Sequence, residues 1–441
     1  MFTTVQDGWL WLIQRDINMK QIFLILSLFV CIFCNATLIP VFTCGFECGV
    51  SSVTDIGQHF RFGSVTVVTY STTTVNNGAQ SLRINPAGVS TGWSTSASLT
   101  SSAIYVIRAY IRFATLPSID LPIVSVGAVT AIGGAVFKVS DSKIYAGHIV
   151  GGTSVGATGV TVTTGVWYLI DVKFDQSANP WTIDVSVDGT ACGQATRALA
   201  ASTSTNIVFG TDAAIPTADY FIDDVLVSQT LADYPIGAGY VNHFIPTSDG
   251  THTATTTTIV KGTIAAPTGE GNVAGATDVF NWVNAVPLLG GATNNTRLVN
   301  QQSNGTTLYA EEIFGAAPGI STPTVAPRGV EVITADREAT TSTGDFTTKL
   351  NDNGTESTII ARGVVAGVIT DRYASKFYAV APTGGAWTVV SGAGNFNNIR
   401  ARFGYASDAN PDQYWRGIMI EAEFAPAVPA VFNKGGFFHV F

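Results

Sequence analysis

The sequence predicts an all-β protein with two β-sandwich domains in tandem behind an N-terminal hydrophobic segment. Apolar and polar residues alternate with a period of two along most of the chain. Turn-forming residues separate these segments, and Gly alone supplies 45 of the 441 residues. No segment beyond the N-terminus shows the period of an amphipathic helix. Strands patterned in this way place one face of a sheet in the core and the other in water.

Residues 1–36 are expected to comprise an N-terminal extension and a secretory signal peptide. Met19-Lys20 supplies a basic start, residues 22–33 are almost wholly apolar, and small residues precede a cleavage point after Ala36. A membrane anchor is the alternative, because residues 22–41 nearly reach the ~20 residues that span a bilayer. The signal peptide is favoured, since polar residues and a proline interrupt the far end of this run.

The first domain is predicted to span residues 45–235. Its clearest strand places five side chains on one face: Tyr105, Ile107, Ala109, Ile111 and Phe113. Residues 168–174 and 181–187 repeat this alternation, and Asp188-Gly189 then supplies a hairpin turn. The domain is therefore expected to be a sandwich of antiparallel strands.

The second domain is predicted to span residues 240–426, after a linker at Gly237-Ala238-Gly239. Strands are expected in five segments: 306–314, 329–333, 376–380, 399–405 and 418–424. Residues 427–441 form an apolar C-terminal tail, which we expect to pack against another surface.

The charge pattern argues against nucleic acid as a partner. The chain has 31 acidic and 22 basic residues, a net charge of −9 and no basic run. Neutralising phosphates requires clustered Lys and Arg. Charged residues make up only 12% of the chain, a composition that is too apolar for intrinsic disorder.

The cysteines leave two alternatives open. The chain has five: Cys31, Cys34, Cys44, Cys48 and Cys192. Cleavage after Ala36 would leave three. Cys44 and Cys48 flank Gly45-Phe46-Glu47 and could pair in an oxidising compartment. Burial as small hydrophobic residues is equally compatible with the sequence.

Two motifs bracket the first domain: Gly45-Phe46-Glu47 opens it, and Phe221-Ile222-Asp223-Asp224-Val225-Leu226-Val227 closes it. Between them lie Gly78-Ala79-Gln80-Ser81-Leu82-Arg83-Ile84, Gly165-Val166-Trp167-Tyr168 and Val187-Asp188-Gly189. In this order the motifs resemble the concanavalin A-like lectin/glucanase superfamily, in the manner of laminin-G-type and carbohydrate-binding jelly rolls. The resemblance covers residues 45–235 and implies a jelly-roll fold. Residues 246–252 and 414–421 loosely resemble β-rich domains of phage-encoded and metagenomic structural proteins.

The resemblance implies a structural Ca²⁺ ion in the first domain. Carried onto this chain, its ligands are Glu47 with Asp223 or Asp224, completed by backbone carbonyls, since Ca²⁺ takes six to eight oxygens. Cys48 departs from the pattern, because relatives commonly carry an acidic or polar residue there, which leaves one ligand fewer. The alternative is that the two Asp residues protect an edge strand from aggregation.

Aromatic residues on the first domain are candidates for sugar binding. Trp93, Trp167 and Tyr110 lie on or near the face opposite the predicted core, where a flat ring can stack on a pyranose. Arg108 and Arg112 could donate hydrogen bonds to sugar hydroxyls nearby. The alternative is that Trp167 only covers the sheet under a loop.

Catalytic activity is not expected. Glucanases of this superfamily place carboxylates on one strand as Glu-x-Asp-x-x-Glu, and the nearest equivalent is Glu421-Ala422-Glu423, with Pro426 where the last Glu belongs. We expect Glu421 and Glu423 to share a solvated face. Glu311-Glu312 is expected to point to opposite faces of a strand, so that the two carboxylates cannot cooperate.

Histidine chemistry is also disfavoured. His243, Asp249 and His252 could be imagined as metal ligands, but a turn built by Ser248-Asp249-Gly250 is favoured, because Asp-Gly sets loop geometry by itself. None of the five His pairs with a plausible Ser or Cys nucleophile.

Together these observations predict a non-catalytic, secreted or particle-surface protein whose lectin-like module serves adhesion or glycan binding. The first alternative is a structural subunit of a virion or extracellular filament, and the second is a glycan-degrading enzyme. A glycan is the expected partner. Membrane contact would require an uncleaved N-terminal segment, and a homo-oligomer is left open.

Overall fold

A computed structural model describes the chain between Leu38 and Pro426, with gaps. The described residues are 38, 40–47, 60–62, 67–88, 92–96, 99–127, 133–149, 154–211, 216–249, 309–316, 320–338, 345–362, 371–407 and 413–426. From Ile39 onward the chain forms one compact unit, so the predicted limits of the two domains stay a prediction. The expected signal peptide, Cys48, His252 and the C-terminal tail lie outside the described residues, and the pairing of Cys44 with Cys48 is not tested.

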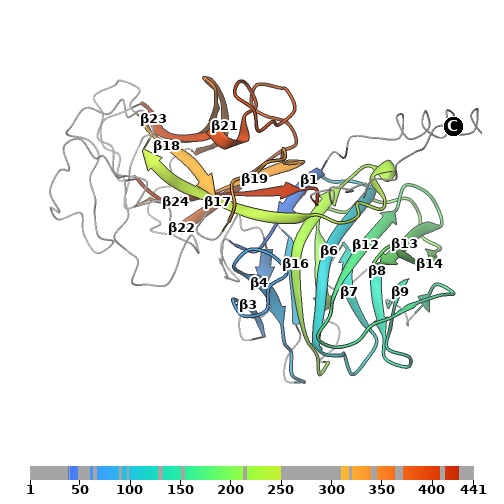
Figure 1. Cartoon of the computed structure of the whole chain (residues 1–441). Helices are drawn as coiled ribbons and strands as arrows, with labels where there is room; N and C mark the ends of the chain where they lie inside the picture. Colours follow the sequence, from blue (N-terminus) through green and yellow to red (C-terminus); the bar gives the residue numbers. More distant parts are fainter. Residues whose placement is uncertain are drawn as a thin grey trace, which may run out of the picture. The chain divides into compact units, whose positions relative to one another are not determined.

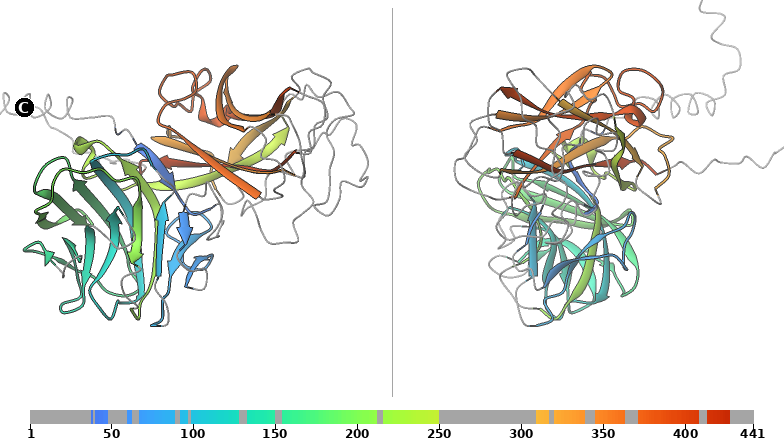
Figure 2. Two further views of the ribbon diagram at one scale, coloured as in Figure 1. Left: turned by 180° about the vertical axis from the view of Figure 1, so that it is seen from behind. Right: turned by 90° about the vertical axis from the view of Figure 1, so that its left-hand side faces the viewer.

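The described residues contain β-strands and two short 3₁₀ helices but no α-helix, which confirms the all-β fold class. Strands up to Ser228 form two antiparallel sheets in two layers (Figures 1 and 2). The front sheet runs in the order β14 (Thr190–Arg197), β13 (Trp181–Val187), β12 (Trp167–Asp175), β6 (Ile104–Thr115), β16 (Asp219–Ser228), β4 (Ser81–Ile84), β3 (Val68–Ser71), and β1 (Pro40–Cys44) also pairs with β16. The back sheet runs in the order β10 (Ser154–Val155), β9 (Lys143–His148), β8 (Gly134–Lys138), β7 (Leu121–Val126), β15 (Ile207–Thr211), β5 (Gly92–Ser96), β2 (Phe60–Phe62), and β11 (Val160–Thr161) also pairs with β9.

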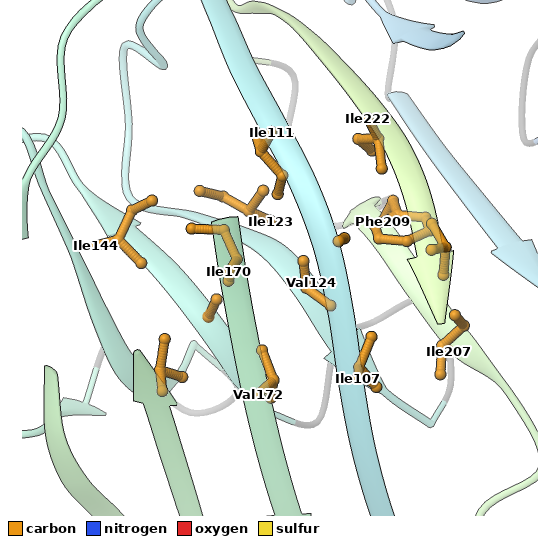
Figure 3. Close-up of a cluster of buried hydrophobic side chains, with 14 of the residues drawn as sticks. Ile107, Ile111, Ile123, Val124, Ile144, Ile170, Val172, Ile207, Phe209 and Ile222 are labelled. Carbon is orange, nitrogen blue, oxygen red and sulfur yellow. The ribbon is translucent and has the colours of Figure 1, made fainter. Parts of the chain in front are cut away.

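One hydrophobic core lies between these two sheets. The front sheet contributes alternate residues, such as Ile107 and Ile111 of β6, and the back sheet contributes Val124 and Phe209 (Figure 3). All five apolar positions expected on β6 are buried here. The period-two prediction is confirmed for this strand, because strand residues two apart share a face.

The first strand and the closing motif lie side by side, as the two bracketing motifs predict. β1 pairs with β16 in antiparallel fashion, with Cys44 opposite Val225. β16 itself lies near the middle of the front sheet, between β6 and β4. The two ends of the sandwich are therefore joined by backbone pairing.

The third sheet contains all the described strands after Ser228. Its order is β21 (Thr355–Arg362), β20 (Asp345–Asp352), β23 (Arg400–Ser407), β18 (Tyr309–Ala316), β17 (Tyr240–Asp249), β24 (Gln413–Phe424), β19 (Gly329–Glu338), β22 (Asp371–Tyr378). All five strand segments expected in this half are found, within a few residues of their predicted bounds.

The third sheet curls around its own core until its two edge strands meet. Side chains of β22 reach β21: Lys376 Nζ donates to the carbonyl of Thr358 at 2.6 Å, and Tyr378 Oη donates to that of Ser357 at 3.4 Å. The core that it encloses takes residues from all eight strands. Trp387 joins it from a loop, and Phe396 joins it from a short 3₁₀ helix. Side-chain bonds thus cover edges that would otherwise be open to pairing.

The segment between β16 and β17 passes through the short 3₁₀ helix η1 (Leu231–Asp233) and then residues 237–239. A second 3₁₀ helix, η2 (Phe396–Asn398), precedes β23. Within the described part of the chain, no helix has the length and apolar character needed to cross a membrane.

Candidate functional site

The three carboxylates expected to bind Ca²⁺ are gathered beside a bulge in β16. The register of β16 against β6 shifts between Asp223 and Leu226, and Asp224 has a φ of +51°. Asp tolerates this left-handed conformation better than most residues do. The bulge releases Asp224 from strict alternation. Both Asp side chains and that of Glu47 are fully buried.

A glycine turn cradles the carboxylate of Glu47. Its Oε1 accepts hydrogen bonds from the backbone N–H groups of Ala79 at 2.8 Å and Gln80 at 3.3 Å. Gly78 lies against the same oxygen, with a φ of +72° and no room for a Cβ atom. The motif at 78–84 therefore supplies donors to the motif at 45–47.

The two Asp side chains are also satisfied by N–H donors. Asp223 Oδ2 accepts from the backbone N–H of Asn76 at 2.8 Å, and its Oδ1 accepts from that of Asp224. Asp224 Oδ2 accepts from the side-chain amide of Asn76 at 2.7 Å, and its Oδ1 accepts from the backbone N–H of Val241 at 2.6 Å. Of the six oxygens of the three carboxylates, only Glu47 Oε2 has no hydrogen-bond partner.

Burial and mutual repulsion favour the protonated forms of these acids. Burial raises the pKa of Glu47 to about 8, and the charges of Glu421 and Asp224 add to the effect. Burial and the neighbouring Asp224 hold the pKa of Asp223 well above its ordinary value. Burial also raises the pKa of Asp224 to about 6, although the positive charge of Arg108 opposes this shift.

This donor set does not fit the expected Ca²⁺ site. Among the described residues, no group of three or more His, Cys, Asp or Glu side chains is arranged to hold a metal ion. Five of the six carboxylate oxygens of Glu47, Asp223 and Asp224 face N–H donors, which compensate their charge without a cation. Ca²⁺ binding stays a prediction of the resemblance alone.

His243 lies close to the unpartnered oxygen of Glu47. Its Nδ1 lies 3.5 Å from Glu47 Oε2, and neither atom has a hydrogen-bond partner. Burial lowers the pKa of His243 to about 4, so that the ring is neutral at pH 7. Asp249, the second imagined ligand, is the last residue of β17.

The expectation that Glu421 and Glu423 face solvent is wrong. Both side chains are fully buried. β24 lies inside the third sheet, between β17 and β19, and it contacts β1. Glu421 accepts hydrogen bonds from the backbone N–H groups of Gly45 and Glu47, both at 3.0 Å. Glu311 and Glu312 are likewise buried.

Arg108 does not contact solvent as a sugar-binding residue would. Its side chain is fully buried, and Nη1 donates to Glu423 Oε1 at 2.6 Å. Its Nε and Nη2 donate to the carbonyl of Asp224 at 3.2 and 3.1 Å. Arg328 forms a second ion pair with Glu423. The expectation that Arg108 binds a ligand is therefore corrected: it is a partner of a buried carboxylate.

Four residues of the front sheet form a row across neighbouring strands. Trp167 of β12 lies opposite Arg112 of β6, which lies opposite Phe221 of β16, which lies opposite Arg83 of β4. Directly opposite residues project from the same face of an antiparallel sheet. Three of these strands, β12, β6 and β16, lie next to one another in Figure 1. The row lies on the outer face of the sheet, because the side chains next to it along these strands, such as Ile111 and Ile222, point into the core.

Tyr110 lies on the same face of β6 as Arg112, two residues before it. It is half-buried and lies opposite Leu169 of β12. Farther along the same face, Asp171 accepts hydrogen bonds from the backbone N–H groups of Ile236 and Gly237 at 3.1 and 3.2 Å. The segment after η1 therefore covers that part of the face. We call the row Trp167, Arg112, Phe221 and Arg83, together with Tyr110, the front strip. Within it the Phe221 ring is buried, with the Arg83 guanidinium over it.

Trp93 is separated from the other candidates. It is half-buried on β5 of the back sheet, opposite Gly210 of β15. Of the five predicted ligand-binding residues, the structure brings Trp167, Tyr110 and Arg112 together and places Trp93 on the other sheet.

Sequence reasoning missed Arg83 and Phe221. Both lie within the quoted motifs, but Phe221 has apolar neighbours on either side, so its face could not be read from alternation. In the structure the Arg83 guanidinium lies 5.7 Å from the centre of the Phe221 ring. Arg83 also donates to both oxygens of Asp219, at 2.9 and 2.8 Å.

Comparison with known proteins returned structural matches only at low similarity. No family model and no curated protein matches the chain. A sialidase matches with 14% identity over 45% of this chain and 19% of its own, at a TM-score of 0.32. Domain 4 of AbnA, a GH43 extracellular arabinanase from Geobacillus stearothermophilus in complex with arabinotriose, matches with 14% identity over 45% of this chain and 89% of its own, at a TM-score of 0.29.

A third structure covers most of the chain. The CBM22-1-CBM22-2 tandem domain of Paenibacillus barcinonensis Xyn10C matches with 12% identity over 88% of this chain and 98% of its own, at a TM-score of 0.24. At these scores the matches carry no argument about the ligand. The fold rests on the strand pairing, and the site rests on the geometry of its residues.

Proposed function

We propose that this chain is a non-catalytic glycan-binding protein that works outside the cell, and that the front strip binds the sugar. The observation that supports this proposal is the direct cross-strand alignment of Trp167, Arg112, Phe221 and Arg83 on one outer face. An indole ring offers an apolar surface for a pyranose ring, and the neighbouring guanidinium groups offer donors for its oxygens.

The length of the row favours an oligosaccharide over a single sugar. The row crosses four neighbouring strands, and adjacent strands lie about 4.8 Å apart, so it extends over about 14 Å. A polymer chain lying across the strands would meet Trp167, then Arg112, and then Arg83, which lies over the buried Phe221 ring. Each contact is weak, and affinity would come from several contacts made together.

The proposal excludes hydrolysis at Glu421 and Glu423. A glycosidase requires two carboxylates that reach the scissile bond from either side. Here Glu423 is paired with Arg108 and Glu421 accepts two backbone N–H groups, and both are fully buried. Neither carboxylate is available to a polymer in solution.

A glycan array with the full chain and two tryptophan variants tests this function. Trp167→Ala removes the half-buried indole of the strip, and Trp93→Ala is the matched control on the back sheet. We expect Trp167→Ala to weaken binding about tenfold, since an aromatic contact contributes about 1.5 kcal/mol. Trp93→Ala should bind as the unaltered chain does. Equal losses in both variants, or no glycan bound by the unaltered chain, would refute the proposal.

A further inference from the structure

The two arginines of the front strip differ in charge compensation. Arg83 is neutralised, because both oxygens of Asp219 accept its hydrogen bonds. Arg112 has one hydrogen bond, from Nε to the carbonyl of Gly165 at 3.1 Å, and forms no ion pair with any carboxylate of the described residues. The strip therefore presents one uncompensated positive charge, between Trp167 and Phe221.

The single hydrogen bond of Arg112 orients its guanidinium group. Because Nε donates to a backbone carbonyl, the plane is anchored at its inner edge while the two terminal nitrogens are left for another acceptor. Such a planar pair of donors matches the two oxygens of a carboxylate or a sulfate. Trp167 stands directly opposite on the next strand, where its ring can contact the sugar that bears the acid.

No carboxylate of the strip competes for this position. Asp219 is engaged by Arg83, and Asp223, which follows Phe221 by two positions on β16, is buried and accepts backbone N–H groups of the 76–78 turn. The chain as a whole carries a net charge of −9, so a polyanion gains nothing from its long-range field. Binding of an acidic sugar would thus depend on a local contact with Arg112 and not on the overall charge of the protein.

We propose that the front strip selects anionic sugars, with Arg112 binding the carboxylate or sulfate group and Trp167 stacking on the ring that carries it. This inference rests on the glycan-binding function proposed above and names the class of ligand. A neutral sugar makes the stacking contact but leaves the terminal nitrogens of Arg112 with water only.

Matched pairs of oligosaccharides test the selection. Oligogalacturonate and its fully methyl-esterified form share one sugar backbone and differ at the carboxyl group, which is charged in the first and a neutral ester in the second. Oligosaccharides of a sulfated galactan are compared with their desulfated forms. We expect the unaltered chain to bind at least one anionic member about tenfold more tightly than its neutral partner, as measured by calorimetry at about 0.15 M salt. The two pairs distinguish a uronate from a sulfate ester.

Variants of Arg112 assign the selection to this residue. Arg112→Gln should bind the anionic and neutral members equally, while Arg112→Lys, which keeps the charge but not the planar fork, should keep part of the preference. Thermal unfolding of both variants checks that they fold. Equal binding of neutral and anionic members by the unaltered chain overturns the inference but leaves the proposed function standing, provided that Trp167→Ala weakens the binding of both members. Absence of any binding overturns both.

Discussion

Arg108 and Glu423 form an ion pair at 2.6 Å between two fully buried side chains that are 315 residues apart in the sequence. Arg108 lies on β6 of the front sheet, and Glu423 lies on β24 of the third sheet. Gly239 packs against this pair so closely that a Cβ atom would collide with both side chains. The pair thus joins the outer face of the first sandwich to the sheet built from the second half of the chain.

Breaking this pair should strongly destabilise the protein. Arg108→Met leaves a buried carboxylate with only Arg328 and removes two donors from the carbonyl of Asp224. We expect a loss of about 3 kcal/mol in the free energy of unfolding, measured by urea denaturation. Arg83→Met removes a partly exposed pair and should cost less than about 1 kcal/mol. Similar losses in the two variants would contradict the prediction.

Stability should fall as the pH rises from 6.5 to 8. The pKa of Glu47 is about 8 in the folded protein against 4.5 as its ordinary value, so the folded state holds more protons throughout this window. An excess of bound protons in the folded state means that the free energy of unfolding decreases with pH, by up to about 1.4 kcal/mol per unit for one group. Asp223, whose pKa is also raised, acts in the same direction.

The range from pH 6.5 to 8 is chosen to limit the effect of His243, which opposes the fall in stability. The pKa of His243 is lowered to about 4 from its ordinary value of 6.5, so this ring makes stability rise with pH mainly between these two values and less and less above 6.5. Asp224, with a pKa of about 6, acts in the same direction as Glu47 but is largely deprotonated within this pH range. Urea denaturation at pH 6.5 and 8 measures the slope, and Glu47→Gln should reduce it. An unchanged slope in that variant would show that Glu47 does not titrate in this range.

Removal of Ca²⁺ should leave the melting temperature unchanged. The resemblance predicts an ion at Glu47 with Asp223 or Asp224, whereas their hydrogen bonds to N–H groups predict compensation without one. Thermal unfolding in EDTA and in excess Ca²⁺ separates these predictions. A rise in melting temperature on adding Ca²⁺, absent with Mg²⁺, would restore the ion.

The alternation of residues predicted the core of the first sandwich correctly, because burial of one face of a strand in a two-layer fold is a local property. The same rule failed at Glu421 and Arg108. Their faces are covered by segments hundreds of residues away, such as Gly45, whose N–H reaches Glu421. No local pattern encodes such a contact. Asp223-Asp224 was recognised as an acidic motif, but the bulge that buries both residues depends on a left-handed backbone at Asp224.

Gly78 should be intolerant of any side chain, for a reason beyond backbone conformation. Its φ is +72°, and a Cβ atom would overlap the Glu47 oxygen that accepts the N–H groups of Ala79 and Gln80. Gly165 is a matched control, since its φ is +84° and no atom lies within 4 Å of its Cβ position.

Gly165→Ala should therefore cost only the strain of the left-handed conformation, about 1 kcal/mol. Gly78→Ala adds to this strain the displacement of the Glu47 carboxylate from its buried donors, which raises the expected loss to about 3 kcal/mol. Urea denaturation of both variants measures the difference. Adding Glu47→Ala to Gly78→Ala should cost less than the sum of the two single changes, because one interaction is lost in both. Additive losses would mean that the turn and the carboxylate stabilise the sandwich independently.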